Sequence, residues 1–281
     1  MDDGSTDGSA EILAKYAGED ERIRVFQQEN GGPASARNHG MREVRGEYVA
    51  FVDADDEVAP RYLEFMIRGL KQYPQAGLAW CEWCRGQERR KMVCPDSVSA
   101  VCYPRPLEHC VLHRKPRLQA MIGGRFFRTS AVLDVRFPDG IDYAEDILFT
   151  YYALSAMEAG VHIPLPLYVY RKNESSLSQR PFTIHRLDHE LACCVQMAVF
   201  SQKHSLSSRA QKKLKQTIAL RFFRFIVKHI RESDSDGSKG WLASYIHKLH
   251  ELELQQIFVP AALPLRYRFF YWACKKRFLH D

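Results

Sequence analysis

The sequence predicts an α/β domain followed by a helical region. Over residues 9–83, stretches with helical periodicity alternate with short apolar stretches typical of buried strands. From residue 181 the periodicity is helical almost throughout. The net charge also changes, from −3 over residues 1–180 (23 Lys and Arg, 26 Asp and Glu) to +9 over residues 181–281 (17 and 8). We therefore expect two domains, 1–180 and 181–281, with a boundary near 178–182.

The first domain is predicted to contain strands separated by helices. The strands are expected at 23–28, 47–53, 76–83 and 165–171, and the helices at 9–17, 33–45, 60–72 and 145–158. Such alternation implies a mostly parallel sheet with helices on its faces and the carboxyl ends of its strands at one edge. Ligands of open α/β sheets bind at that edge. The pattern is irregular between residues 85 and 140.

The second domain is predicted to be helical at 182–204, 208–231, 240–258 and 262–279, with a polar linker at 231–240. A composition of 46% hydrophobic and 26% charged residues is typical of a globular protein and excludes a disordered one. The sequence has no signal peptide and no apolar stretch near 18 residues, so we expect no transmembrane helix. The eight cysteines lack regular spacing, which favours a reduced, cytoplasmic protein.

The opening segment "DGSTDG" (3–8) is dense in turn-forming residues. It imitates the start of a calcium-binding loop, but Ala14 stands where that loop requires a bidentate Glu, so calcium is excluded. Two interpretations remain. The segment is a plain turn in which Asp7 or Ser9 caps the following helix, or it is a nucleotide-binding loop in which Asp3 accepts hydrogen bonds from a base or ribose.

Three carboxylates, Asp53, Asp55 and Asp56, follow the expected strand at 47–53. Carboxylates this close repel one another unless a cation lies among them. Oxygen ligands suit Mg²⁺ or Mn²⁺, with a diphosphate completing the coordination. The alternative is an acidic loop before the helix at 60–72.

Two other segments carry candidate polar residues. "ENGGPASARNHG" (29–40) combines a glycine turn with Arg37 and Asn38, and an arginine beside an acidic loop either orients its carboxylates or meets phosphate. Glu145 and Asp146 begin the helix at 145–158. Acidic residues favour a helix's first turn for dipole reasons alone, and the alternative is a general base for an acceptor hydroxyl.

These segments, in this order, resemble the family 2 glycosyltransferases, inverting enzymes with the GT-A fold. The resemblance covers residues 1 to about 178. It implies that Asp3 contacts the uracil or ribose of a nucleotide-sugar, and that Arg37 and Asn38 support the nucleotide pocket. It implies further that Asp53 and Asp55 form the DxD motif, with Asp55 nearer the metal and Asp53 toward ribose or metal. Asp146 becomes the catalytic base, with Glu145 beside it.

The resemblance implies a hexosyltransferase that depends on Mn²⁺ or Mg²⁺. Its expected donor is a UDP-sugar, and its expected acceptor is a hydroxyl of a glycan or lipid-linked acceptor in surface polysaccharide synthesis. In the family, a first strand and a nucleobase loop precede the "DDGS" segment, and we expect this GT-A domain to be truncated at its N-terminus. A misplaced start, a fragment and a degenerate gene product each explain this. The alternative function is an inactive remnant that binds nucleotide-sugar or membrane without transfer.

The C-terminal segment 264–281 contains six aromatic and five basic residues. Such a mixture is typical of an interfacial helix on an anionic membrane, and the alternative is a helix docked on the catalytic domain. We expect a cytoplasmic protein that is peripheral on the inner face of the membrane. Nucleic acid is not an expected partner, because no recognised binding motif accompanies the basic charge. His185 and His189 share one helix face, which suits either a metal or ordinary packing and solvent contact.

Overall fold

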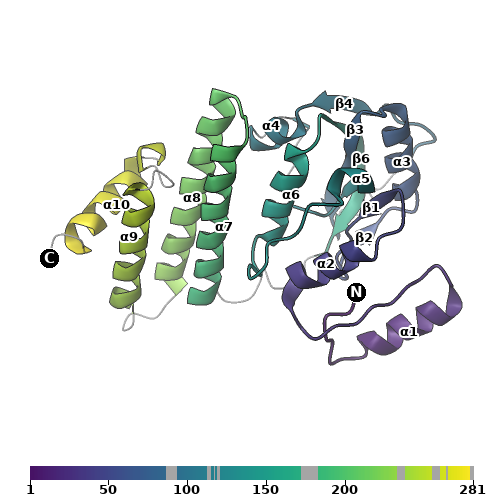
Figure 1. The fold of residues 1–281 in the computed structure, drawn as a ribbon, viewed down its shortest axis with the longest axis horizontal. Helices are drawn as coiled ribbons and strands as arrows, with labels where there is room; N and C mark the ends of the chain where they lie inside the picture. Colours follow the sequence, from purple (N-terminus) through teal and green to yellow (C-terminus); the bar gives the residue numbers. More distant parts are fainter. Residues whose placement is uncertain are drawn as a thin grey trace. The chain divides into compact units, whose positions relative to one another are not determined.

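The structure is a computed structural model, and it describes residues 1–86, 94–112, 115–116, 118, 121–171, 183–232, 238–254, 260–263 and 265–278. The chain divides into two compact units, residues 1–106 with 118–172 and residues 107–117 with 173–281. Figure 1 shows the sheet in the first unit and a series of helices in the second. The boundary expected near 178–182 lies outside the described residues, and the separate roles expected for the two domains stay predictions.

The first unit is built around one six-stranded sheet. Its strands are β1 (Tyr48–Ala50), β2 (Glu57–Val58), β3 (Ala76–Arg85), β4 (Val101–Pro104), β5 (Arg125–Arg128) and β6 (Ala159–Tyr170). Its helices are α1 (Ser9–Glu19), α2 (Gly32–Arg42), α3 (Tyr62–Gln72), α5 (Thr129–Val132) and α6 (Glu145–Ser155), and α4 (Pro106–Val111) begins where the two units divide.

The sheet is mixed, which corrects the expectation of a mostly parallel one. Its order is β1-β5-β3-β6-β2, with β4 also paired to β6, and only the β3–β6 pairing is parallel. The pairings nevertheless make β1, β3 and β6 run in one direction, and these are the strands expected at 47–53, 76–83 and 165–171. The difference arises because β5 inserts antiparallel between β1 and β3. Both β4 and β5 come from the segment whose pattern is irregular.

The strand expected at 23–28 does not form. Gln27 makes a single parallel bridge to Asp2, in which the Asp2 amide donates to the Phe26 carbonyl (2.8 Å) and the Gln28 amide donates to the Asp2 carbonyl (3.0 Å). A strand requires a ladder of such bonds with a neighbour. Here one residue supplies the whole pairing, so an extended apolar segment remains a loop.

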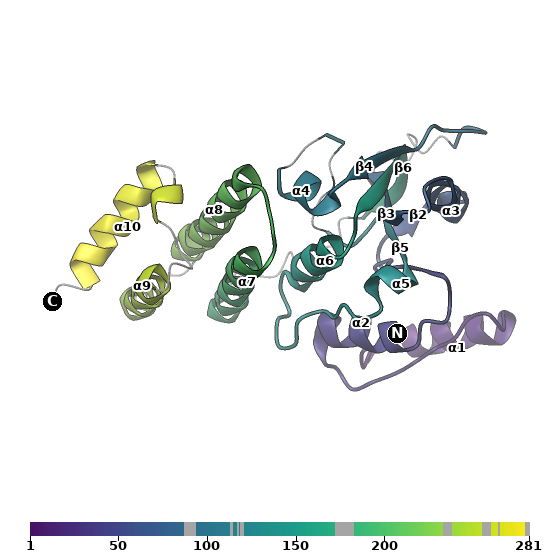
Figure 2. The same ribbon diagram turned by 45° about the horizontal axis from the view of Figure 1, so that its top comes forward.

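The two faces of the sheet carry different helices, as Figure 2 shows for α3 and α6. Successive residues of β5 point to opposite faces. Phe126 packs against Tyr62 of α3, with ring centroids 6.3 Å apart, and Phe127 packs against Phe149 of α6 at 6.1 Å. Phe149 stacks in turn on Phe137 at 4.1 Å. These rings give the first unit a core on both sides of the sheet.

The second unit is helical, as the sequence predicts. It contains α7 (Ile184–Lys203), α8 (Ser208–Glu232), α9 (Ser238–Leu254), the short 3-10 helix η3 (Pro260–Ala262) and α10 (Leu265–Phe278). None of these described helices has the length and apolarity that crossing a membrane requires. All eight cysteines lie in described residues, and no disulfide joins any of them.

Candidate functional site

Arg37 joins two of the segments singled out in the sequence. It lies on α2, and its Nη2 donates to Asp53 Oδ1 at 2.9 Å, just beyond β1. Its Nη1 donates to Oε1 of Glu145, the first residue of α6, at 2.5 Å. The Arg37 side chain is 19% exposed, and those of Asp53 and Glu145 are 44% and 8% exposed. One guanidinium therefore ties the acidic loop to the start of α6.

The charges in this cluster do not balance. Burial raises the pKa of Glu145 to about 7, repulsion from Asp146 adds to the rise, and attraction to Arg37 opposes it. Burial alone would lower the pKa of Arg37, but attraction to Asp53 and Glu145 outweighs burial and raises it. The Arg37 guanidinium also lies over the Phe137 ring, 5.5 Å from its centroid. The single positive charge of Arg37, held against the Phe137 ring, therefore contacts two carboxylates, Asp53 and Glu145, and cannot neutralise both.

The three carboxylates after β1 have different surroundings. Asp53 is bound by Arg37. Asp56 is bound twice: its Oδ2 accepts from the Tyr168 hydroxyl (2.7 Å) and its Oδ1 accepts from the Arg171 amide (2.9 Å). Asp55 makes no hydrogen bond or ion pair within the described part of the chain. Asp55 is therefore the carboxylate of the three that is available to an outside cation.

The opening loop is fastened to the segment before α2. Asp3 Oδ1 accepts hydrogen bonds from Gln28 Nε2 (2.7 Å) and from the Gly31 amide (2.9 Å). Gly4 has a φ of +74°, and a Cβ there would lie 2.9 Å from the Asn30 amide nitrogen, so only glycine fits without strain. These bonds hold Asp3 in place through Oδ1 and leave Oδ2 without a donor among the described residues.

The neighbours of Asp3 have structural partners. The buried Asp2 carboxylate accepts from Ser5 and from Gln27, and the hydrogen bonds from Ser5 lower its pKa most. Asp7 accepts from the Ser9 amide at 2.9 Å, next to the start of α1. The N-cap residue of α1 is Gly8 and no side chain caps the helix, so the capping expected of Asp7 or Ser9 is not found. The Asp7–Ser9 contact instead tightens the turn that also presents Asp3.

Asn38 is used for positioning in this structure. Its Nδ2 donates to the Phe137 carbonyl at 2.9 Å, and its Oδ1 accepts from the Phe137 amide at 2.8 Å. Only 6% of Asn38 is exposed. The amide therefore holds the chain that leads to α6, and its expected contact with a nucleotide stays a prediction.

The start of α6 has an unusual backbone. Ala144, its N-cap residue, has a φ of +67°, in the left-handed region that residues with a Cβ disfavour. Such residues cost about 1–3 kcal/mol and cluster at functional sites. The next two residues differ in exposure, because Glu145 is buried and Asp146 is partly exposed. The turn thus places one carboxylate against Arg37 and the following one at the surface.

Comparison with known proteins shows similarity to glycosyltransferases. Residues 1–94 match the family model described as Glycosyl transferase family 2. The match covers the first 94 of the 281 residues. The chain is 29% identical over 228 residues to EpsH of Bacillus subtilis (strain 168), which is named as a glycosyltransferase, across 78% of this chain. The chain spans 64% of the length of EpsH.

Several solved structures share the fold of this chain. The structure of S. aureus TarS 1-349 in complex with UDP matches 98% of this chain and 76% of its own, with a TM-score of 0.69 and 18% identity. The complex of TarS 1-349 with UDP-GlcNAc has a TM-score of 0.65 and 20% identity, and the match covers 98% of this chain and 77% of that one. The mannosyltransferase PcManGT from Pyrobaculum calidifontis, in complex with GDP-Man and Mn²⁺, has a TM-score of 0.51 and 15% identity. The match covers 100% of this chain and 77% of that one. The expected GT-A fold is confirmed.

Among the expected site residues, the structure brings Arg37, Asp53 and Glu145 into direct contact and leaves Asp55 open. It does not give Asp3 or Asn38 a contact with that cluster. Tyr168 binds Asp56 from β6 and was not predicted, because a tyrosine in an apolar strand has no distinguishing spacing.

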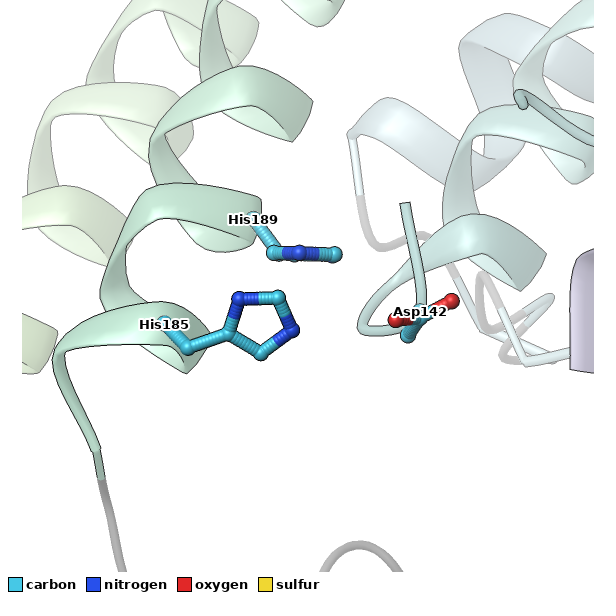
Figure 3. A group of neighbouring side chains, drawn as sticks. All are labelled: Asp142, His185 and His189. Atoms are coloured by element: carbon cyan, nitrogen blue, oxygen red, sulfur yellow. The ribbon is translucent and has the colours of Figure 1, made fainter. Parts of the chain in front are cut away.

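The histidine pair in the second unit is also visible. His185 and His189 lie one turn apart on α7, with ring centroids 4.1 Å apart in a T-shaped arrangement (Figure 3). Two imidazoles of one helix supply two ligands, and a structural zinc site takes four.

Proposed function

We propose that this chain transfers a sugar from a nucleotide-sugar to an acceptor hydroxyl with inversion at the anomeric carbon. The observation that carries the proposal is the Arg37 bridge between Asp53 and Glu145. It brings the acidic loop next to the turn that bears Asp146, so a donor held at the loop and a base at the turn would share one site. The match of residues 1–94 to the glycosyl transferase family 2 model supports the reaction class.

The donor side of the proposal rests on Asp3, Asp53 and Asp55. Carboxylate oxygens are the ligands that Mn²⁺ and Mg²⁺ prefer, and Asp55 has no competing partner within the described residues. Asp55 would bind the metal, with Asp53 toward the metal or ribose, and Asp3 Oδ2 would accept from ribose or uracil. The bound ion would stabilise the charge that develops on the leaving diphosphate. TarS, in complex with UDP-GlcNAc, supports a UDP-sugar, and PcManGT supports Mn²⁺.

The acceptor side rests on Asp146. Its carboxylate would take the proton of the acceptor hydroxyl as the hydroxyl oxygen attacks the anomeric carbon. The bond from that carbon to the diphosphate oxygen breaks, and its electron pair leaves with the nucleoside diphosphate. Arg37 would fix Glu145, so that the first turn of α6 and hence Asp146 keep their place. The acceptor we propose is a glycan or lipid-linked hydroxyl.

The outer face of α10 supports a membrane partner. Tyr271 and Lys275 bind Glu253 of α9, at 2.7 and 3.0 Å, so this side of the helix is docked. Trp272 is 59% exposed, and the Lys276 ammonium lies 5.7 Å from its ring. An exposed tryptophan beside basic residues suits the cytoplasmic leaflet, whose lipids are anionic. We expect Trp272→Ala to weaken binding to vesicles containing phosphatidylserine, and equal binding by both proteins would contradict this role.

The experiment that tests the reaction is calorimetric titration with UDP, with and without Mn²⁺. We expect binding that requires the metal and that Asp55→Ala abolishes. The matched control is Asp139→Ala, which removes an exposed carboxylate of the same unit. Loss of binding in both variants, or binding indifferent to Mn²⁺, would overturn the donor site. Binding without transfer from UDP-sugars to a hydroxyl acceptor would favour the inactive remnant.

A further inference from the structure

We propose that Tyr168 is a positioning residue that fixes the acidic loop 53–56 in its binding conformation. Asp56 is then an anchor of that loop and not a third metal ligand. The inference deepens the proposed function and rests on it for its consequence in donor binding. Its structural half, that Tyr168 holds the loop, stands on contacts within the first unit.

The Tyr168 hydroxyl contacts both ends of the loop. It donates to Asp56 Oδ2 at 2.7 Å and lies 3.4 Å from the Asp53 amide, which donates to it. A hydroxyl donates once and accepts through its lone pairs, so both contacts form together. Tyr168 is 2% exposed, which shields these bonds from water. One oxygen atom therefore spans the residues on either side of Asp55.

Strand pairing closes the loop from behind. Val58 of β2 pairs with Tyr168, and the Ala59 amide donates to the Leu167 carbonyl at 2.9 Å. The Arg171 amide donates to the other oxygen of Asp56 at 2.9 Å. Both carboxylate oxygens of Asp56 are thus bound by the end of β6. Because both of its oxygens are already bound, Asp56 is not expected to bind a metal. Asp55, which lies between the anchored residues Asp53 and Asp56, remains available to one.

Two glycines make room for the Tyr168 ring. A Cβ on Gly123 would lie 2.7 Å from Tyr168 Cζ, and one on Gly124 would lie 3.3 Å from Tyr168 Cβ. Gly124 also has a φ of +72°, which a side chain disfavours. The glycine pair before β5 therefore forms the slot that sets where the hydroxyl ends.

The consequence for binding is preorganisation. Without these bonds, repulsion would push the three neighbouring carboxylates apart, and the loop would adopt several conformations. Binding a cation would then require ordering the loop, and the entropy lost in that ordering weakens binding. Hydrogen bonds to an ionised carboxylate are roughly twice as strong as neutral ones. The Tyr168–Asp56 bond therefore holds the loop, before any metal binds, in the conformation in which Asp55 can act as a ligand.

Hydrogen exchange tests the structural half directly. We expect Tyr168→Phe to speed exchange at the amides of Asp53 and Arg171 at least several-fold, while amides of β3 keep their protection. The matched control is Tyr62→Phe, which removes an equally buried hydroxyl that donates to the Arg125 carbonyl at 3.0 Å. The control should leave Asp53 and Arg171 unchanged. Unchanged exchange at these amides in Tyr168→Phe would overturn the inference, whatever the protein binds.

Titration with UDP and Mn²⁺ tests the functional half. We expect about tenfold weaker binding in Tyr168→Phe and in Asp56→Asn, the effect of losing a hydrogen bond to a charged group. Asp55→Ala should abolish binding, so the two aspartates differ in kind. Equal loss in Asp56→Asn and Asp55→Ala would make Asp56 a ligand and overturn the anchor role. Absence of metal-dependent binding in the unmodified protein would reject the proposed function, and the exchange result would still decide the role of Tyr168.

Discussion

Two partly buried arginines, one in each unit, bind carboxylates in different ways. In the second unit, Arg221 of α8 binds Glu190 of α7 through Nε at 2.8 Å and Nη2 at 2.7 Å. Glu190 is 3% exposed, and both of these Arg221 nitrogens bind its Oε2. Burial alone would lower the pKa of Arg221, but attraction to Glu190 outweighs it and raises the pKa. Arg221 thus joins two neighbouring helices through this one carboxylate.

Arg37 in the first unit binds two carboxylates and adjoins further acidic residues. Asp53 and Glu145 share its guanidinium, and Asp55 and Asp146 lie beside them in the chain. Burial raises the pKa of Glu145 to about 7, and repulsion from Asp146 adds to the rise. The comparison teaches that an arginine bound to one carboxylate joins two helices, whereas an arginine among several carboxylates leaves negative charge for a cation and a proton.

The largest expected effect falls on the unbalanced cluster. Asp146→Asn should lower the rate of sugar transfer by a factor of about 10²–10⁴, the contribution of general base catalysis. Binding of UDP with Mn²⁺ should persist, because the donor carboxylates are untouched. Steady-state transfer with parallel calorimetry checks both. A transfer rate equal to that of the unmodified protein would remove Asp146 from the base role.

The two arginines should differ in what their removal costs. Arg221→Met should lower the free energy of unfolding by about 3–5 kcal/mol, the cost of removing one partner of a buried ion pair. Arg37→Met should cost less stability, since Asp53 is half-exposed and Glu145 already accepts a proton near neutral pH. It should instead impair metal-dependent UDP binding. Urea unfolding at pH 6 and calorimetry on both variants make the measurement, and equal stability losses would break the comparison.

The smallest expected effect concerns pH. Burial raises the pKa of Glu145 from its ordinary value of 4.5 to about 7 in the folded chain. Between pH 4.5 and 7 the folded state therefore holds more protons than the unfolded state, and this group's contribution to stability falls as pH rises. The total change is roughly 3 kcal/mol at most. Glu145→Gln, which can still accept from Arg37, should be more stable than the unmodified protein at pH 8 and similar to it at pH 4.

Urea unfolding of both proteins from pH 4 to pH 8 checks this prediction. Parallel stability curves across the range would show that Glu145 does not titrate in it. Glu253→Gln is a suitable reference, because hydrogen bonds from Tyr271 and Lys275 lower the pKa of that carboxyl against the effect of burial.

Much of this arrangement follows from local patterns. The helices of the second unit end within a few residues of their predicted bounds, because amphipathic periodicity and breaks such as Pro181 are local signals. Asp53 and Asp55 are likewise recognisable from their place after an apolar strand. These features depend on residues close in sequence, so a single chain reveals them.

Features that depend on distant partners were not predictable. The segment 23–28 has the composition of a strand, yet pairing decides strand formation and only Asp2 pairs with it. β5 and β4 were missed because short strands between partners carry little periodicity of their own. The meeting of Arg37 with Glu145 spans 108 residues of sequence, and the role of Tyr168 depends on a glycine slot more than forty residues earlier in the chain.

The antiparallel insertion of β5 has a consequence for the order of folding. β1 and β3 lie on either side of β5 and pair with it, so neither neighbour relation exists until residues 125–128 have been made. The segment that matches the family model, 1–94, ends before this central strand. A growing chain must therefore keep two apolar strands unsatisfied while more than forty further residues are synthesised. This non-local closure predicts slow folding and a dependence on chaperones during translation.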